Sequence, residues 1–152
     1  RRLRPALQRL GFYLSGERPV EQVLPLIARK AIASGERLLV VSGDAALLDR
    51  VDEALWEAFP ADFLAHGRAG AAHAERQPIL LSEGCRADNG ARLIALADGV
   101  WREEAEAFAR GFLFFDDAGR DRARPAWTAL DSRAGMEREF HVLDNGKWVR
   151  RR

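Results

Sequence analysis

The sequence predicts one three-layer α/β domain, in which a mostly parallel sheet with an antiparallel portion carries helices on both faces. Apolar runs of strand length alternate along the chain with segments of helical periodicity. One of these runs, RLLVVSGD at 37–44, is largely continuous in apolar residues, which is typical of a strand buried on both faces of a parallel sheet. The 152 residues suffice for one such domain, and no internal repeat or domain boundary divides residues 1–152.

A strand and a helix are expected at the start of the chain. A basic lead-in at residues 1–10 precedes an aromatic and aliphatic run at 11–15, which is typical of a strand. The apolar residues between 20 and 35 recur at helical spacing, and Gly35 stands where a C-terminal cap is expected. Pro25 predicts either a kink or a helix confined to the residues that follow it, because proline lacks the amide N–H.

A second helix and an irregular segment follow the strand at 37–44. Asp44 is expected to cap this helix, because its side chain can accept a hydrogen bond from an amide of the first turn. The helix has one apolar stripe, formed by Leu47, Leu48, Val51 and Leu55. Residues 60–77 are rich in alanine, glycine, arginine and histidine, show no clear period, and are expected to form a loop.

Three strands and a short helix are expected in the middle of the chain. Strands are predicted at 78–82 and 91–97, and the polar segment between them is too short for a crossover helix. An antiparallel hairpin is therefore expected there. Residues 101–111 predict a short helix with acidic residues near its start, and 112–117 predict a further strand.

The last part of the chain is expected to hold a helix and a strand. Pro125 suits a first helical turn, so the segment 120–135 is expected to be helical in its second half, with Gly135 as its cap. Residues 139–144 alternate apolar and polar side chains, which is typical of an edge strand, and turn residues DNG follow. A basic tail occupies 149–152.

Composition excludes several classes of function. The 24 basic and 23 acidic residues give a net charge of +1, which argues against a general nucleic-acid binder. A single cysteine, Cys85, excludes an internal disulfide and is typical of a reducing compartment. No apolar run approaches the roughly 20 residues of a membrane span. We therefore expect a soluble, cytoplasmic protein that does not bind membranes.

The junctions between strands and helices carry no phosphate-binding motif. None of them has the form G-x-x-x-x-G-K-[ST] or G-x-G-x-x-G. Residues 42–44, Ser-Gly-Asp, could still bind an anion at a helix N-terminus, although a single glycine before a helix is usually only a turn. Asp116 and Asp117 end a predicted strand, where they either hold a metal or, more commonly, cap a helix.

No set of residues adequate for catalysis is found. His66 and His73 are seven residues apart, whereas metal sites prefer tighter pairs or added cysteine and carboxylate ligands. A dyad of Cys85 with one of the histidines, including His141, is geometrically possible, but nothing in the sequence favours it. We therefore expect neither an enzyme nor a cofactor.

Two groups of residues indicate interaction surfaces. A helix that starts near Pro125 brings Arg124 close to its first turn, with Trp127 nearby, and Arg120 and Arg122 precede it in the loop. Guanidinium groups beside an aromatic ring can hold a carboxylate while the ring packs an apolar side chain. The alternative, which composition alone favours, is a solvated basic helix end whose tryptophan fills the core. The second group consists of three aromatic residues at the end of the second helix and after it, namely Trp56, Phe59 and Phe63. They cover the protein's own core, line a substrate pocket or dock a partner.

These segments, in this order, resemble the chi subunit family of bacterial DNA polymerase III, from Gly11 to about Trp148. Specific parts are VEQ at the start of the first helix and G-x-R-x-L-[IV] at the second strand. A third is the loose motif LDxxDEALW-x(6)-F-x-x-H, carried by Leu48, Asp49, Asp52, Glu53, Ala54, Leu55, Trp56, Phe63 and His66. Residues 69–88 match poorly.

The resemblance implies a Rossmann-like fold without a working nucleotide site. It also implies a non-catalytic subunit that links the clamp-loader complex to single-stranded-DNA-binding protein by holding the acidic C-terminal tail of that protein. Residue by residue, the tail-binding positions become Arg120, Arg124 and Trp127. Thr128 stands where the enterobacterial pattern has lysine, and Asp131 follows. The resemblance therefore implies a weaker grip on the tail or a rearranged set of cations.

The resemblance also implies a second partner on the opposite side. In the family this partner is the small psi subunit of the clamp loader, and in some members a helicase-type protein. Trp56 and Phe63 match positions at or near that surface, whereas Phe59 is expected to cover the end of its helix. For Trp56, the sequence leaves both a core-covering and a docking role open.

Two other functions compete with this one. The first is a small-molecule or nucleotide-binding α/β enzyme with a degenerate phosphate loop, its site at residues 42–44 and 116–117. The second is direct DNA binding through the arginine clusters, for which the near-neutral charge predicts only a weak, salt-sensitive affinity.

Overall fold

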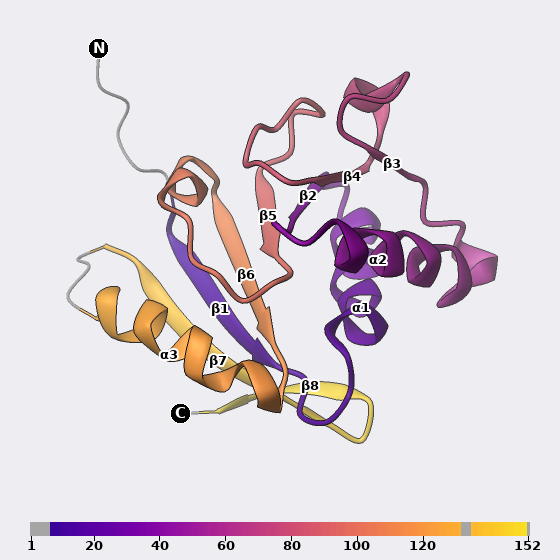
Figure 1. Ribbon diagram of the computed structural model, residues 1–152. Helices are drawn as coiled ribbons and strands as arrows, with labels where there is room; N and C mark the ends of the chain where they lie inside the picture. Colours follow the sequence, from indigo (N-terminus) through magenta and orange to yellow (C-terminus); the bar gives the residue numbers. More distant parts are fainter. Residues whose placement is uncertain (1–6, 132–134, 152) are drawn as a thin grey trace, which may run out of the picture.

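One eight-stranded sheet forms the centre of the described part of the chain, residues 7–131 and 135–151 of the computed structural model (Figure 1). Its strands are β1 (Arg9–Leu14), β2 (Leu38–Val41), β3 (His66–Arg68), β4 (Ile79–Ser82), β5 (Leu93–Leu96), β6 (Arg110–Phe115), β7 (Glu137–Asp144) and β8 (Lys147–Arg151). Their order across the sheet is β3-β4-β2-β5-β6-β1-β7-β8. Neighbours run parallel except for β7 and β8, so the mostly parallel sheet with an antiparallel portion is confirmed.

Helices cover both faces of this sheet, as the sequence predicts. The elements are α1 (Val20–Ala33), α2 (Ala45–Glu57), α3 (Arg120–Ala129) and the 3₁₀ turns η1 (Pro60–Asp62), η2 (Ala74–Arg76), η3 (Glu103–Ala107) and η4 (Asp117–Gly119). α1 and α2 share one hydrophobic core with Leu38 and Val40, whereas α3 shares the other with Leu39 and Val41. Successive residues of β2 thus point to opposite faces, and the domain has three layers.

The expected signals at the ends of the first two helices are confirmed. The backbone amide of Ala46 donates to Oδ1 of Asp44 at 3.0 Å, so Asp44 caps α2. The predicted apolar stripe of α2 is buried, namely Leu47, Leu48, Val51 and Leu55. Gly35 lies just beyond the end of α1 with a φ of +81°, a conformation that favours glycine.

Both prolines lie inside helices that begin before them. Pro25 and Pro125 are each the sixth residue of their helix. The carbonyl groups that each proline leaves without an N–H partner belong to Glu21 and Asp121, in the first turn, where disruption is small. Of the two expectations for Pro25, confinement of the helix to the residues after it does not hold, because α1 begins at Val20. The prediction that α3 begins near Pro125 is wrong, because α3 begins at Arg120. Gly135 does not cap α3 either, because that helix ends at Ala129.

The hairpin predicted between residues 78–82 and 91–97 is wrong, although both strands exist. β4 and β5 each pair in parallel with β2, which lies between them. Residues 83–92 make the connection without a helix, since ten extended residues reach roughly 33 Å, enough to return along a short strand and pass one neighbour. Asn89 is buried in this connection and donates to the Gln77 carbonyl at 2.9 Å.

Two segments differ in detail from their predictions. The expected loop at 60–77 contains β3, a three-residue strand at the sheet edge, which is too short to show a period of two. In place of the helix expected at 101–111 the structure has only the 3₁₀ turn η3. The last two residues of that segment, Arg110 and Gly111, already belong to β6. The strand predicted at 112–117 is confirmed and starts earlier than expected.

The C-terminal residues are part of the sheet. β7 is not the expected edge strand, because it pairs with β1 on one side and with β8 on the other. Asn145 and Gly146 have φ values of +50° and +77°, which closes a tight hairpin between β7 and β8. The antiparallel portion of the sheet therefore lies here. The basic tail predicted at 149–152 belongs to β8 up to Arg151; residue 152 and most of the lead-in at 1–10 lie outside the described residues.

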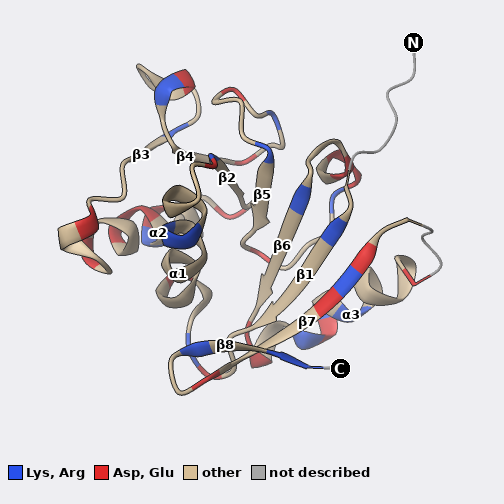
Figure 2. Cartoon of the chain, turned by 180° about the vertical axis from the view of Figure 1, so that it is seen from behind, with Lys and Arg blue, Asp and Glu red and all other residues tan. Residues whose placement is uncertain are grey.

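One half of the sheet has a helix on only one of its faces. Figure 2 shows β6, β1 and β7 facing the viewer without a helix in front of them, while α3 lies behind. α1 and α2 lie to one side, toward β2 and β4. The face opposite α3 therefore carries no helix over β1 and β7 and is called the open face below, although Tyr13 on it is buried under other side chains.

Candidate functional site

The three residues expected to bind an acidic tail line one hollow between α3 and the sheet. Its volume is about 220 Å³, and its lining, called the α3 groove below, consists of Phe12, Phe115, Arg120, Ala123, Arg124, Trp127 and Phe140. Arg120, Arg124 and Trp127 follow each other at spacings of four and three residues, so they share one side of the helix. Two cations and an aromatic ring thus border a hollow with apolar walls.

Trp127 both packs against the core and lines the groove. Its ring meets Phe12 edge-on, with centroids 4.9 Å apart, and Phe140 at 6.1 Å. The guanidinium of Arg138 lies 4.1 Å above the ring and also donates to the Trp127 carbonyl at 2.6 Å. The tryptophan is therefore fixed from several sides, so the core-filling and groove-lining interpretations both hold for it.

The cations near the groove differ in their partners. Arg120 is more than half exposed and lies 3.5 Å from the Asp117 carboxylate. Arg124 is exposed and forms no ion pair with any residue that the structure describes. Arg122, which sequence reasoning grouped with these residues, instead lines a separate hollow at the carboxyl ends of the strands. Arg124 is therefore the cation most available to an anionic ligand.

Thr128 stands where the enterobacterial pattern has lysine. It is exposed and lies outside the α3 groove, so this difference does not alter the groove lining. The carboxylate of Asp131 is bound by Arg138. Its negative charge is thus partly neutralised within the protein. Sequence reasoning missed Arg138. This residue lies on a strand, two positions before Phe140, and no local pattern indicates that its guanidinium stacks on Trp127.

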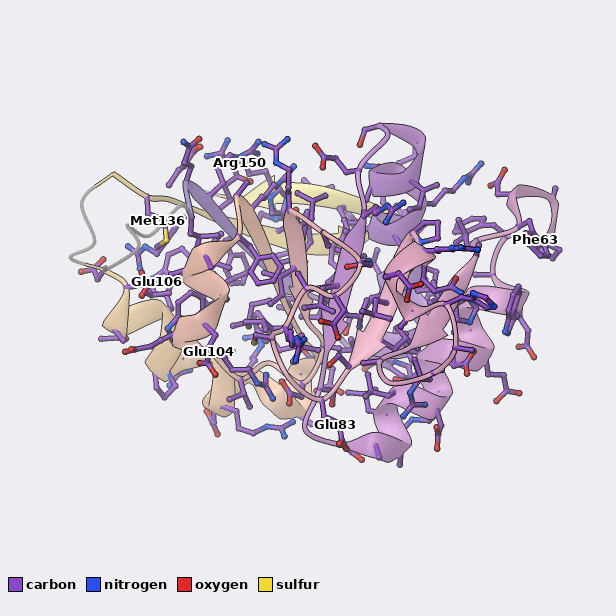
Figure 3. The ribbon with its side chains drawn as sticks, turned by 90° about the horizontal axis from the view of Figure 1, so that it is seen from above. Phe63, Glu83, Glu104, Glu106, Met136 and Arg150 are labelled. Carbon is purple, nitrogen blue, oxygen red and sulfur yellow. The ribbon has the colours of Figure 1, made fainter. Side chains whose placement is uncertain are left out.

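A second candidate surface lies at the end of α2. Trp56 is 47% exposed and Phe63 is 70% exposed, and their ring centroids are 5.5 Å apart. Phe59, by contrast, packs against the core beneath the guanidinium of Arg29. Figure 3 shows Phe63 projecting from one end of the molecule, while α3 lies at the other. Trp56 and Phe63, together with His66, are called the α2 aromatic surface below.

His66 supports this surface from below. Its side chain is 1% exposed, its Nε2 lies 2.6 Å from Oδ1 of Asp52, and its Nδ1 lies 2.8 Å from the Leu64 carbonyl. The ring of Trp56 rests on it at 4.3 Å. Asp52, Trp56, Phe63 and His66 all belong to the loose motif in the sequence. Their shared spacing was therefore the available signal for this arrangement.

The position at which an α/β fold could bind phosphate holds a carboxylate of the protein itself. The Gly43 amide donates to Oδ2 of Asp98 at 2.9 Å, and Arg102 binds both Asp98 oxygens at 2.9 and 2.7 Å. Burial alone would raise the pKa of Asp98, but hydrogen bonds from Arg102 and Gly43 hold it below the usual aspartate value. An incoming phosphate would have to displace this ionised group.

The other residues considered for catalysis serve structural roles. Asp116 accepts a hydrogen bond from the Gly119 amide at 2.8 Å, and Asp117 pairs with Arg120. Burial raises the pKa of the Cys85 thiol, which makes it a poorer nucleophile. His141 bonds Glu139 on the sheet. Within residues 7–131 and 135–151, no group of three potential ligands could hold a metal ion.

The fold and the filled anion position define a Rossmann-like α/β protein with two candidate surfaces for other macromolecules. The family model for the DNA polymerase III chi subunit, HolC, matches residues 7–137. This is most of the chain, so the protein belongs to the DNA polymerase III chi subunit family, as the resemblance predicts. Membership gives it an accessory role in DNA replication, in association with the polymerase III complex.

A search among curated proteins finds no match to the chain. Of the helices that the structure describes, none is long and apolar enough to cross a membrane.

Proposed function

We propose that this protein links the clamp-loader complex to single-stranded-DNA-binding protein by holding the acidic C-terminal tail of that protein in the α3 groove. In this role it is a non-catalytic cytoplasmic adaptor and requires no cofactor. The observation that carries the proposal is that Arg120, Arg124 and Trp127 border one apolar hollow. The family pattern and the chemistry of the residues select the same patch, except that chemistry alone also included Arg122, which lies outside the hollow.

The groove suits a peptide that ends in an aromatic residue with a free carboxylate. The apolar walls made by Phe12, Trp127 and Phe140 suit the terminal side chain. Arg124, which has no internal ion pair among the described residues, suits the carboxylate through charge-assisted hydrogen bonds. Arg120 has only a longer, exposed contact with Asp117 and can exchange it for an acidic residue upstream in the tail.

Fluorescence anisotropy with a labelled acidic peptide ending in Asp-Phe tests this proposal. We expect micromolar binding that Arg124→Glu abolishes. Arg122→Glu is the matched control, because it makes the same change on the same helix but outside the groove, and it should bind the peptide nearly as well. Absence of binding at low salt, or equal losses in both variants, would contradict the proposal.

We further propose that the α2 aromatic surface docks the second partner, a psi-like subunit of the clamp loader or a helicase-type protein. Exposed aromatic side chains are common binding anchors, and Trp56 and Phe63 adjoin each other. Phe63 lies at the far end of the molecule from α3, which would let the protein hold both partners at once (Figure 3). Trp56→Ala and Phe63→Ala should each weaken capture of this partner from the native lysate and leave the melting temperature nearly unchanged.

The alternative function is nucleotide binding at residues 42–44, and a ligand screen tests it. The Gly43 amide already donates its hydrogen bond to the Asp98 carboxylate. ATP, dinucleotides and Mg²⁺ should therefore give no thermal stabilisation through that position. A stabilisation of several degrees that an Asp98→Ala substitution increases would revive it. For bare DNA, binding through the arginine clusters is expected to be weak and salt-sensitive.

A further inference from the structure

A second cleft lies on the open face of the sheet, on the side away from α3. It has a volume of about 370 Å³, in the range of about 300–1,000 Å³ that is usual for small-ligand sites. One wall is α1, with Ile27 and Lys30, and the floor is formed by strand residues that include Tyr13, Arg110 and Trp148. None of these residues belongs to the α3 groove or to the α2 aromatic surface. The cleft is called the open-face cleft below.

Two cationic side chains, Lys30 and Arg110, line this cleft together with the polar groups of Tyr13, Ser34 and His141. Lys30 and Arg110 form no ion pair with any residue in the described part of the chain. Nε1 of Trp148 is buried and has no hydrogen-bond partner within the same part. Lysine, arginine and indole N–H groups donate but do not accept. An anionic ligand that is rich in acceptors matches the two cations of the cleft, of which Arg110 also hydrogen-bonds Tyr13.

Aromatic rings form the rest of the cleft. The rings of Tyr13 and His141 stack with centroids 4.4 Å apart, and Trp148 meets Tyr13 edge-on at 5.1 Å. Gly11 makes this possible, because a Cβ there would lie 2.4 Å from the tyrosine ring. Tyr13 is itself 2% exposed, so a ligand in the cleft meets chiefly the partly exposed ring of Trp148. That ring suits an aromatic ligand body, since aromatic groups pack well by stacking or edge contact.

The negative charge beside the cleft is already neutralised. Glu139, whose side chain is 2% exposed, pairs with Arg9 at 2.7 Å and with His141 at 3.0 Å. Arg150 lies 3.8 Å from the same carboxylate. Glu139 therefore orients His141 and does not compete with a bound anion for Lys30 or Arg110.

We propose that the open-face cleft binds a phosphate-bearing ligand with a planar aromatic body, the chemistry of a nucleotide. Lys30 and Arg110 bind the phosphate, and the aromatic residues of the floor pack against the base. A free nucleotide and a nucleotide within single-stranded DNA share this chemistry. The titration described next distinguishes between them.

The indole N–H resonance of Trp148, assigned through its loss in Trp148→Phe, reports on this cleft in a ¹H–¹⁵N spectrum. Thymidine monophosphate, a short thymidine oligonucleotide and inorganic phosphate are titrated in turn at millimolar concentrations. We expect the resonance to shift saturably with at least one of the first two and less with phosphate alone. A tighter response to the oligonucleotide identifies a single strand as the source, and a tighter response to the monophosphate identifies a free nucleotide.

Lys30→Glu should weaken the response about tenfold, as expected for loss of a charge-assisted contact. The chain's other lysine provides the matched control, because Lys147→Glu makes the same change outside the cleft lining and should leave the affinity unchanged. Arg124→Glu should also leave it unchanged, which separates this cleft from the α3 groove. The proposal is overturned if neither nucleotide moves the Trp148 resonance, or if Lys30→Glu and Lys147→Glu respond alike.

Discussion

The α3 groove and the α2 aromatic surface lie at opposite ends of the molecule and differ in how they are attached to the core. The groove is a hollow between a helix and a sheet, and its tryptophan is held by Phe12, Phe140 and Arg138. Trp56 and Phe63 instead project into solvent, beside a short 3₁₀ turn. In the groove, the residue that is proposed to bind also stabilises the fold. On the aromatic surface, binding and folding are largely separate.

The largest expected difference between the two regions is in stability. Trp127→Ala should lower the free energy of unfolding by about 2–4 kcal/mol, because it leaves a cavity against Phe12 and removes the ring under Arg138. Phe63→Ala should change it by less than about 0.5 kcal/mol, as at other exposed positions. Urea denaturation of both variants measures the difference. Equal losses would show that the two aromatic residues are attached to the core in the same way.

This difference also explains how far the sequence could predict the site. Arg120, Arg124 and Trp127 were singled out because cations and an aromatic ring lie within one short segment that matches the tail-binding positions of the family. Arg138 was missed, because it reaches Trp127 only through the pairing of β7 with β1, which brings distant segments together. Contacts of this kind depend on the order of strands in the sheet and leave no local pattern in the sequence.

The fold shows the same division between local and long-range information. The cap at Asp44 and the stripe of α2 were predictable, because they depend on neighbours a few residues away. The hairpin proposed between β4 and β5 was wrong, because strand pairing is decided by which strand fills the space between them. The short strand β3 was missed, because three residues are too few to establish a period.

The next largest expected effect is the energetic coupling between Asp52 and His66, which lie beneath Trp56. Removing either Asp52 or His66 breaks the same contact, so the double variant Asp52→Asn/His66→Gln should cost less than the sum of the single ones. The difference, the coupling between the pair, is expected to be about 1–2 kcal/mol. Chemical denaturation of the four proteins gives this coupling. Strictly additive losses would show that the two side chains do not act as a unit.

A spectroscopic control accompanies this cycle. His66→Gln should change the fluorescence of Trp56, because the two rings are in contact at 4.3 Å. The change should be absent from a Trp56→Phe background. If it persists there, another tryptophan responds to the substitution, and the support assigned to His66 is contradicted.

A smaller effect is expected from ionic strength, which should weaken binding at the α3 groove more than binding at the α2 aromatic surface. Binding at the α3 groove depends on partly exposed guanidinium groups, whose attraction is screened over about 10 Å at 0.1 M ionic strength. Tail-peptide affinity should therefore fall by about tenfold when the ionic strength is raised well above that value. Capture of a partner at the α2 aromatic surface should change by less than about twofold, because it relies on apolar burial. Similar salt dependence at both surfaces would refute this contrast.

The smallest expected effect tests whether Phe63 is kept for binding at a cost to the fold. Its φ of +45° is in the left-handed region, where a side chain with a Cβ is strained. Phe63→Gly should therefore be more stable than Phe63→Ala by about 0.5–1 kcal/mol, since glycine adopts this conformation freely. Both variants should lose partner capture equally, because both lack the ring. An alanine variant as stable as the glycine variant would show that the backbone at this position is unstrained, so that Phe63 is retained there at no cost to folding.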